Sequence, residues 1–166
     1  MVITSDILLK GSAWHKAIEN LTPIFKSKTN YMIYMLSVGI GIMYDKRIAE
    51  LDTTEEDEIH AVPRNVIRNQ DNGHLEMMYQ TAILTTKTEE LSEEERLTRA
   101  FDDQYDDKEK LNLLLQFANF GVVKLVEQIG DTTLETMSNI SDFLNGSIEG
   151  DNLNLDPITE DILLTE

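Results

Sequence analysis

The chain has 166 residues, a length typical of one domain, and a formal net charge of −17 at pH 7 from 31 Asp and Glu against 14 Lys and Arg. This acidity argues against direct binding to nucleic acids or to anionic membranes, because both attract Lys and Arg. It favours a protein partner with a basic surface. The chain contains no cysteine, which excludes disulfides, cysteine nucleophiles and thiolate metal sites.

The beginning of the chain predicts one short helix. Residues 1–11 have no clear periodicity, and Gly11 separates them from the next segment. Ser12 is placed to cap a helix, and Pro23 is expected to end or restart it. The apolar side of this helix consists of Trp14, Ile18 and Leu21.

Residues 30–44 are apolar on nearly every side, which predicts a central helix buried by several neighbours. A buried strand is the alternative, since short apolar runs do not distinguish the two, but the length favours a helix. Gly39 and Gly41 lower the helix propensity. They indicate either the close approach of another helix or an early helix end. The run is too short to span a membrane, which needs about 20 apolar residues.

Residues 45–74 form the main irregular region of the predicted fold. The stretch 50–58 contains six acids and no base. Pro63 is expected to begin a short helix that extends through Ile67. The sequence Asp-Asn-Gly at 71–73 predicts a turn.

Two amphipathic helices are predicted next. The first covers about 75–86, where apolar residues recur at three- and four-residue spacing. The second begins at Ser92, which is placed to form a capping box with Glu95. Leu97 and Phe101 of this second helix are expected to face the core.

The clearest amphipathic pattern covers residues 108–129, with Gly130 as the C-terminal cap. Within it Asn119 is flanked by apolar residues, so its amide is expected to be buried and hydrogen-bonded. Asp131 or Thr132 then caps a last helix. The apolar residues of that helix are Leu134, Met137, Ile140, Phe143 and Leu144.

These patterns predict an all-α protein, with a single compact domain of about five to seven helices over residues 1–146. The core is expected to centre on residues 31–43 and 111–129. An acidic tail follows at 147–166, with six acids and no base. We expect this tail to be flexible or to dock on a partner through its aliphatic end.

The acidic clusters and the end of the tail are the candidate partner-binding residues. Acids in the 102–107 segment are also placed to cap the following helix. An alternative function is mimicry of DNA phosphates by carboxylates on rigid helices, which would inhibit a nucleic-acid-binding protein. The candidate residues are Glu55, Glu56, Asp57, Glu58, Asp102, Asp103, Asp106, Asp107, Ile162, Leu163 and Leu164.

No segment matches a catalytic or cofactor-binding motif, so we expect no enzymatic activity and no cofactor. The chain has neither a Gly-rich phosphate loop nor a serine in a nucleophile-elbow motif. His60 and His74 each follow an Asp three residues earlier, a spacing that could present metal ligands from two helices. A metal-dependent enzyme using His60 and His74 is therefore a second alternative, although the inward glutamates of such a site are not evident.

Two segments resemble small accessory proteins associated with bacterial DNA phosphorothioation (Dnd-type) defence loci. The first is Phe-Lys-Ser-Lys-Thr-Asn-Tyr at 25–31, followed by an apolar helix that ends in Gly-Ile-Gly at 39–41. The second is Phe-Ala-Asn-Phe-Gly-Val-Val-Lys-Leu at 117–125. The resemblance covers about a third of the chain. It implies an accessory role in a prokaryotic defence or DNA-modification complex and no transferable catalytic residue.

Together these features predict a non-enzymatic accessory or adaptor subunit that acts through protein–protein interaction. A cytoplasmic location is expected, because the N-terminus lacks a cationic and apolar leader. A homo-oligomer is a further alternative, since a chain with this much apolar helix could bury one face in a dimer.

Overall fold

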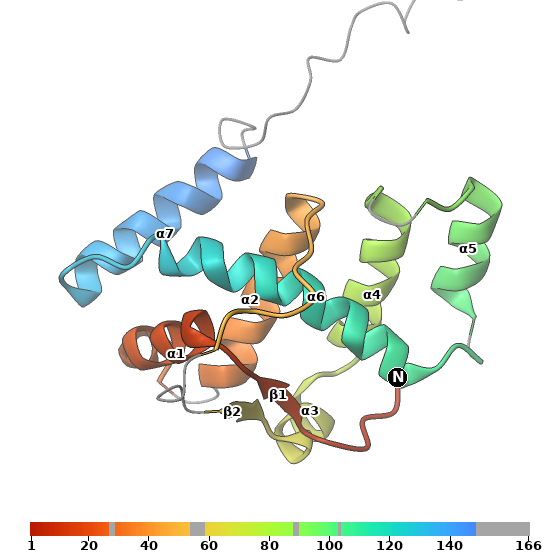
Figure 1. The fold of residues 1–166 in the computed structure, drawn as a ribbon, viewed down its shortest axis with the longest axis horizontal. Coiled ribbons are helices and arrows are strands. Elements are labelled where there is room, and N and C mark those ends of the chain that lie inside the picture. The colour runs from red at the N-terminus through yellow and green to blue at the C-terminus, as the bar shows by residue number, and fades with distance from the viewer. Residues whose placement is uncertain (27–28, 54–58, 88–89, 103, 149–166) are drawn as a thin grey trace, which may run out of the picture.

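The computed structural model describes residues 1–26, 29–53, 59–87, 90–102 and 104–148. Within them, seven helices and one pair of strands form a single, mostly helical domain (Figure 1), which confirms the predicted fold class. Residues 149–166 of the predicted acidic tail lie outside the described residues. The elements are β1 (Ile7–Leu9), α1 (Ser12–Phe25), α2 (Thr29–Met43), β2 (His60–Val62), α3 (Arg64–Gln70), α4 (His74–Thr85), α5 (Glu93–Phe101), α6 (Asp107–Val126) and α7 (Thr133–Ile148).

The centre of the domain is the crossing of α2 and α6, the most extensive helix–helix interface in the described part of the chain. Each helix has a glycine at the point of contact, Gly41 in α2 and Gly121 in α6. A Cβ atom at Gly41 would lie 2.6 Å from the carbonyl carbon of Phe117, and one at Gly121 would lie 2.6 Å from that of Ser37. The prediction of close helix approach is therefore confirmed at Gly41. At Gly39 it is wrong, because a Cβ there would meet nothing within 4 Å.

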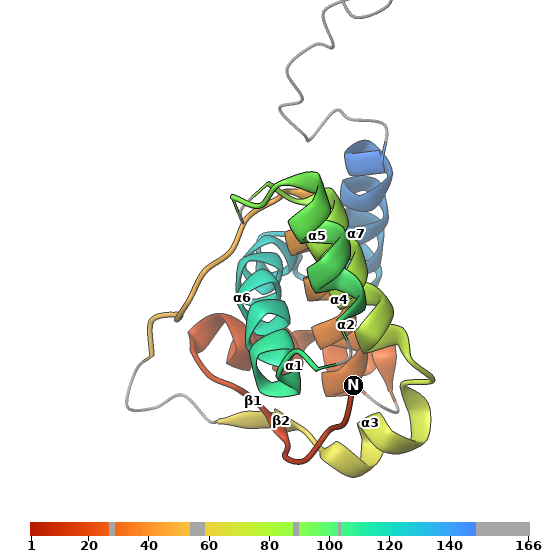
Figure 2. The same ribbon diagram turned by 90° about the vertical axis from the view of Figure 1, so that its right-hand side faces the viewer.

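The other helices surround this pair. α1 and α4 each pack against both α2 and α6, and α7 packs on α1. Figure 1 shows α4 between the α2–α6 pair and α5, and in the turned view of Figure 2 α5 lies in front of α4, at the side of the domain that faces the viewer. The core is thus centred on the two predicted segments. Its largest fully buried aromatic side chains are Trp14, Tyr34, Tyr79 and Phe117.

A short antiparallel sheet, absent from the predicted fold, joins the two irregular regions. β1 pairs with β2 in the register Ile7 to Val62, Leu8 to Ala61 and Leu9 to His60. Strands of three residues are too short to show a period-two pattern in the sequence. The pairing of these two segments therefore could not be predicted from the pattern of either one.

Two boundary predictions near the start of the chain are wrong. Ser12 is the first residue of α1 and not its cap; Gly11 occupies the cap position and makes no side-chain cap bond. Pro23 lies inside the last turn of α1, which continues to Phe25. Farther along the chain, α3 begins directly after Pro63, and the capping box at the start of α5 is present, as predicted.

The end of the domain differs from prediction in detail. α6 ends at Val126, so Gly130 is not its cap. Thr132 does cap α7, because its Oγ1 accepts a hydrogen bond from the Glu135 amide at 3.1 Å. α7 buries Ile140 but exposes Leu134 and Met137, which were expected on its inner face. No helix among the described residues is both long and apolar enough to cross a membrane.

Candidate protein-interaction surface

α5 is placed by polar contacts and not by an apolar inner face. Of its residues only Ala100 is buried. Arg96 reaches back to the end of α4, where its guanidinium donates to the carbonyl oxygens of Ile83, at 2.8 Å, and Thr86, while its Nε donates to the Leu91 oxygen at 3.1 Å. These bonds use carbonyl groups left free where α4 ends, and they fix α5 against α4.

The apolar residues of α5 face outward. Leu97 is 56% exposed and Phe101 is 61% exposed, so the prediction that they face the core is wrong. The two lie four residues apart on one side of the helix. The helix therefore presents an apolar pair, which we call the α5 face, at the edge of the domain.

Carboxylates border the α5 face. Glu93, Glu94 and Glu95 occupy the first turn of α5, where the helix dipole favours negative charge. The Ser92 hydroxyl accepts from the Glu95 amide, and the Ser92 amide donates to the Glu95 carboxylate at 2.8 Å. The Ser92 hydroxyl also donates to the Glu95 carboxylate at 2.7 Å, and this bond, together with the one from the Ser92 amide, holds the pKa of Glu95 below its ordinary value. An apolar pair beside acids is suited to a partner that combines apolar and basic side chains.

The candidate acids that the structure describes also have partners within the chain. Asp102 accepts from the Gln104 amide at 2.8 Å. Asp106 caps α6 by accepting from the Lys108 amide at 2.9 Å, which confirms the predicted capping role of this segment. Asp107 accepts from the Val2 amide at 2.6 Å. The other candidates lie outside the described residues: Glu55, Glu56, Asp57, Glu58, Asp103, Ile162, Leu163 and Leu164.

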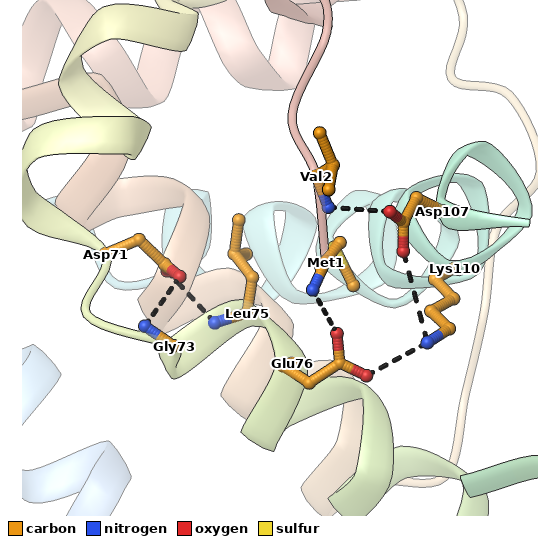
Figure 3. A network of polar contacts seen from close by, with 8 residues as sticks. All are labelled: Met1, Val2, Asp71, Gly73, Leu75, Glu76, Asp107 and Lys110. Atoms are coloured by element: carbon orange, nitrogen blue, oxygen red, sulfur yellow. Dashed lines mark hydrogen bonds and ion pairs between the residues drawn. The ribbon is translucent and has the colours of Figure 1, made fainter. Parts of the chain in front are cut away.

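A buried ionic network connects α4, α6 and the N-terminal segment (Figure 3). Glu76 of α4 pairs through one oxygen with Lys110 of α6 at 3.0 Å and through the other with the amine of Met1 at 2.7 Å. Lys110 is only 3% exposed, so the network neutralises a charge that would otherwise be costly to bury. The sequence did not predict this network, because Lys110 ends the charged run 106–110, a pattern that is typical of a solvated helix start.

The network shifts the pKa values of both charged side chains. Burial alone raises the pKa of Glu76, but the amine of Met1 and Lys110 outweigh it and hold that pKa below the ordinary value. Burial alone lowers the pKa of Lys110, but Glu76 and Asp107 outweigh it and raise that pKa. Both groups therefore stay charged at neutral pH, where they pair with each other at 3.0 Å.

Asp71 lies just before the start of α4 and bonds to backbone amides there. Its carboxylate accepts from the amides of Gly73, at 3.1 Å, and Leu75, at 3.0 Å (Figure 3). The Tyr31 hydroxyl donates to it at 2.9 Å. Burial, together with this bond to a carboxylate, raises the pKa of Tyr31. The predicted turn at 71–73 thus also carries the side chain that caps α4.

The histidines are not arranged as the metal hypothesis requires. His60 lies against His15 of α1, with 3.2 Å between His60 Nε2 and His15 Nδ1, whereas the His74 side chain is exposed at the start of α4. Asp57 lies outside the described residues, and Asp71 is used in capping. Among the residues that can be described, no group of three or more His, Asp or Glu side chains could hold a metal ion.

Asn119 is the buried polar residue that the sequence predicted. Its Oδ1 accepts from the Trp14 indole at 2.9 Å, and its Nδ2 donates to the carbonyl oxygens of Ile48, at 3.1 Å, and Ala49, at 3.3 Å. The amide therefore joins α6 to α1 and to the segment that follows α2. All three of these hydrogen bonds stabilise the fold.

No protein-family model matches the chain, and no curated protein or solved structure is detectably similar to it. Its function is therefore inferred from its own residues and their geometry.

Proposed function

We propose that this protein is a non-enzymatic adaptor or accessory subunit that binds a protein partner with a basic surface through the α5 face. One observation carries the proposal: Leu97 and Phe101 are both more than half exposed on a helix that the domain holds in place by other contacts. Large apolar side chains on a fixed helix are typical anchors of an interface, because desolvating them needs no reordering of the backbone.

Charge complementarity defines the partner. The chain has a net charge of −17, and three glutamates occupy the first turn beside the apolar pair. Lys and Arg around an apolar pocket on the partner would be attracted to this surface and oriented by it. The weakening of binding by salt is a direct consequence, because exposed charges are screened beyond about 8 Å at physiological ionic strength.

The resemblance of residues 25–41 and 117–125 to accessory proteins of DNA phosphorothioation loci supports placing this role in a prokaryotic defence or DNA-modification complex, in the cytoplasm. The chain would then act on DNA only through its partner, since its own charge repels phosphates. In the alternative function, inhibition by DNA mimicry, the partner would bind either DNA or this protein but not both.

The test is co-purification of the tagged protein with the products of its genomic neighbours, with and without nuclease. We expect one protein at fixed stoichiometry, retained after nuclease treatment and lost from the Leu97→Ser/Phe101→Ser variant. The matched control is Leu134→Ser/Met137→Ser, which removes an exposed apolar pair (77% and 49% exposed) from α7. Equal recovery with both variants would exclude the α5 face.

Two further results would redirect the proposal. Competition between the partner's DNA and this protein would favour the DNA-mimic function over the adaptor function. Substrate turnover by the purified protein without any partner would contradict a non-enzymatic role. Loss of a dimer in the α7 control variant, measured by light scattering, would instead identify Leu134 and Met137 as a self-association surface.

A further inference from the structure

A polar cleft of about 670 Å³ adjoins the N-terminal segment and α3. Its lining comes from residues 1–4, from α3 and from the start of α4. The volume falls within the range of roughly 300–1,000 Å³ that is typical of small-molecule sites. Figure 1 shows α3 at the bottom of the domain and α5 at its right-hand edge, so the cleft is separate from the α5 face.

Two arginines of α3 carry positive charge into the cleft. Arg64 and Arg68 both line it, and both are exposed. Because they are four residues apart, their side chains leave the helix on the same side, with about 5–6 Å between their Cβ atoms. The Arg64 guanidinium donates to the carbonyl oxygen of Thr4 at 3.3 Å. Within the described part of the chain neither guanidinium forms an ion pair, so both charges are available to a ligand.

The two carboxylates of the cleft already have partners within the chain. Asp71 accepts from two backbone amides at the start of α4, and Glu76 pairs with Lys110 and with the amine of Met1. Figure 3 shows both carboxylates turned toward these partners. The charged groups of the lining residues are then three cations and two anions, in a chain whose net charge is −17. The cleft is therefore a locally positive site on an acidic protein.

This local balance determines the size of the ligand. Exposed charges are screened beyond about 8 Å at physiological ionic strength, so a small anion in the cleft interacts mainly with the groups that line it. A DNA duplex would instead face the whole acidic surface and be repelled by it. The cleft is therefore suited to a small anionic ligand and not to a nucleic acid.

The lining residues also indicate the chemistry of the ligand. A guanidinium donates two parallel N–H groups to the oxygens of a phosphate, and two guanidinium groups on successive helical turns suit a doubly charged phosphate group. No aromatic side chain lines the cleft among the residues that are described, so a nucleobase would lack a stacking surface. Thr4 and Asn72 also line the cleft, and their side chains can bond to hydroxyl groups.

We propose that this cleft binds a small phosphorylated polyol, whose phosphate group is held by Arg64 and Arg68. The rest of the cleft accommodates the polyol, beside Thr4 and Asn72. This site is independent of the α5 face, so its failure would leave the proposed adaptor role unchanged.

Isothermal titration of the full chain with glycerol 3-phosphate, in a chloride buffer of constant ionic strength, tests the site. We expect one ligand per chain and no binding of glycerol, which lacks the phosphate group. Glycerol that binds as tightly as glycerol 3-phosphate would overturn the proposal. Inorganic phosphate is expected to bind more weakly, because it lacks the hydroxyl groups. Equal affinity for inorganic phosphate would overturn the assignment of a polyol.

Arg68→Gln is the first variant, because the Arg68 side chain forms no hydrogen bond or ion pair with any residue that the structure describes. We expect at least about tenfold weaker binding of glycerol 3-phosphate, since a charge-assisted hydrogen bond is lost. Arg64→Gln/Arg68→Gln should show no measurable binding, with unchanged helical circular dichroism.

The matched control is Lys16→Gln, which removes one positive charge from an exposed position of α1. Its affinity for glycerol 3-phosphate should stay within about twofold of the wild type, because exposed charges outside the cleft are screened. Equal weakening in Arg68→Gln and Lys16→Gln would overturn the proposal, since the effect would then come from net charge. Unchanged affinity in the double arginine variant would overturn it as well.

Discussion

The α2–α6 crossing and α5 represent opposite uses of apolar sequence. At the crossing, side chains are removed at Gly41 and Gly121 so that two backbones touch, and the surrounding apolar residues are buried. In α5, large apolar side chains are present, but they point to solvent. The comparison shows that hydrophobicity alone does not place a residue in the core. The partner helix and its distance decide that placement.

The physical cause is the contact that fixes each helix. α2 and α6 are held by close packing, because their backbones touch at Gly41 and Gly121 and buried apolar side chains surround this contact. α5 is held by Arg96, whose guanidinium binds carbonyl groups at the end of α4. Because a polar anchor fixes α5, the helix can stay in place while its apolar side remains exposed. Substitutions in the two regions test this difference, from the largest expected effect on stability to the smallest.

Gly121→Ala is expected to have the largest effect. The added methyl group would overlap the backbone of Ser37, so the two central helices would have to separate. We expect a loss of more than about 3 kcal/mol in the free energy of unfolding, measured with urea. The control is Gly39→Ala, where the methyl group meets nothing within 4 Å and the higher helix propensity of Ala should stabilise by roughly 0.5–1 kcal/mol. Similar losses for both would mean that the helices do not touch at Gly121.

Glu76→Gln is expected to destabilise the domain by roughly 3 kcal/mol at pH 7, because it leaves the buried Lys110 with only the more distant Asp107, at 4.0 Å, as a counter-charge. Glu94→Gln, the same change at an exposed site in α5, should alter stability by less than about 0.5 kcal/mol. Thermal unfolding of both variants distinguishes a buried network from a surface charge effect.

The same variant predicts a pH dependence. The pKa of Glu76 is lower in the folded state than its ordinary value, so its contribution to stability is present above about pH 4.3 and is lost as pH falls through the folded-state value. The pKa of Lys110 is raised, so its contribution is lost only as pH rises through its folded-state value, above about 10.4. Between pH 7 and 3 the wild type should therefore lose more stability than Glu76→Gln. Parallel curves would show that Glu76 is not coupled to folding.

Asn119→Leu is expected to cost about 1–3 kcal/mol, because the Trp14 indole and two backbone carbonyl groups lose their partner. Asn112→Leu, on another face of the same helix and exposed, is the control and should be nearly neutral. An unchanged melting temperature for Asn119→Leu would mean that water replaces the lost bonds.

Phe101→Ser should change stability by less than about 0.5 kcal/mol, because the ring already faces solvent. Ala100→Asp, the adjacent residue on the buried side of the same helix, should cost more than about 2 kcal/mol by burying a charge. Equal effects on the urea midpoint would show that α5 packs through both faces and would remove the basis for its proposed role in binding.

Much of the local structure could be predicted from particular residues. Ser92 and Glu95 define the start of α5, Thr132 defines the start of α7, and the amide of Asn119 is buried and hydrogen-bonded. The cap predictions are correct because a cap depends on groups only a few residues away in the sequence. The prediction for Asn119 is correct because buried amides are hydrogen-bonded in almost every protein interior. The candidate site could be predicted less well: the acids at 102–107 were identified, but the exposure of Leu97 and Phe101 was not.

The sequence by itself determined the helical class, most helix starts, the central role of residues 31–43 and 111–129, and the acidity that favours a basic partner. Only the tertiary structure decided which side of each helix is buried, which glycine meets a backbone, and that Ile7–Leu9 pairs with His60–Val62. Periodicity reports that a helix has an apolar side, but burial depends on whether another element comes within contact distance. In α5 Leu97 and Phe101 remain exposed, and the helix is held instead by the bonds from Arg96 to the end of α4.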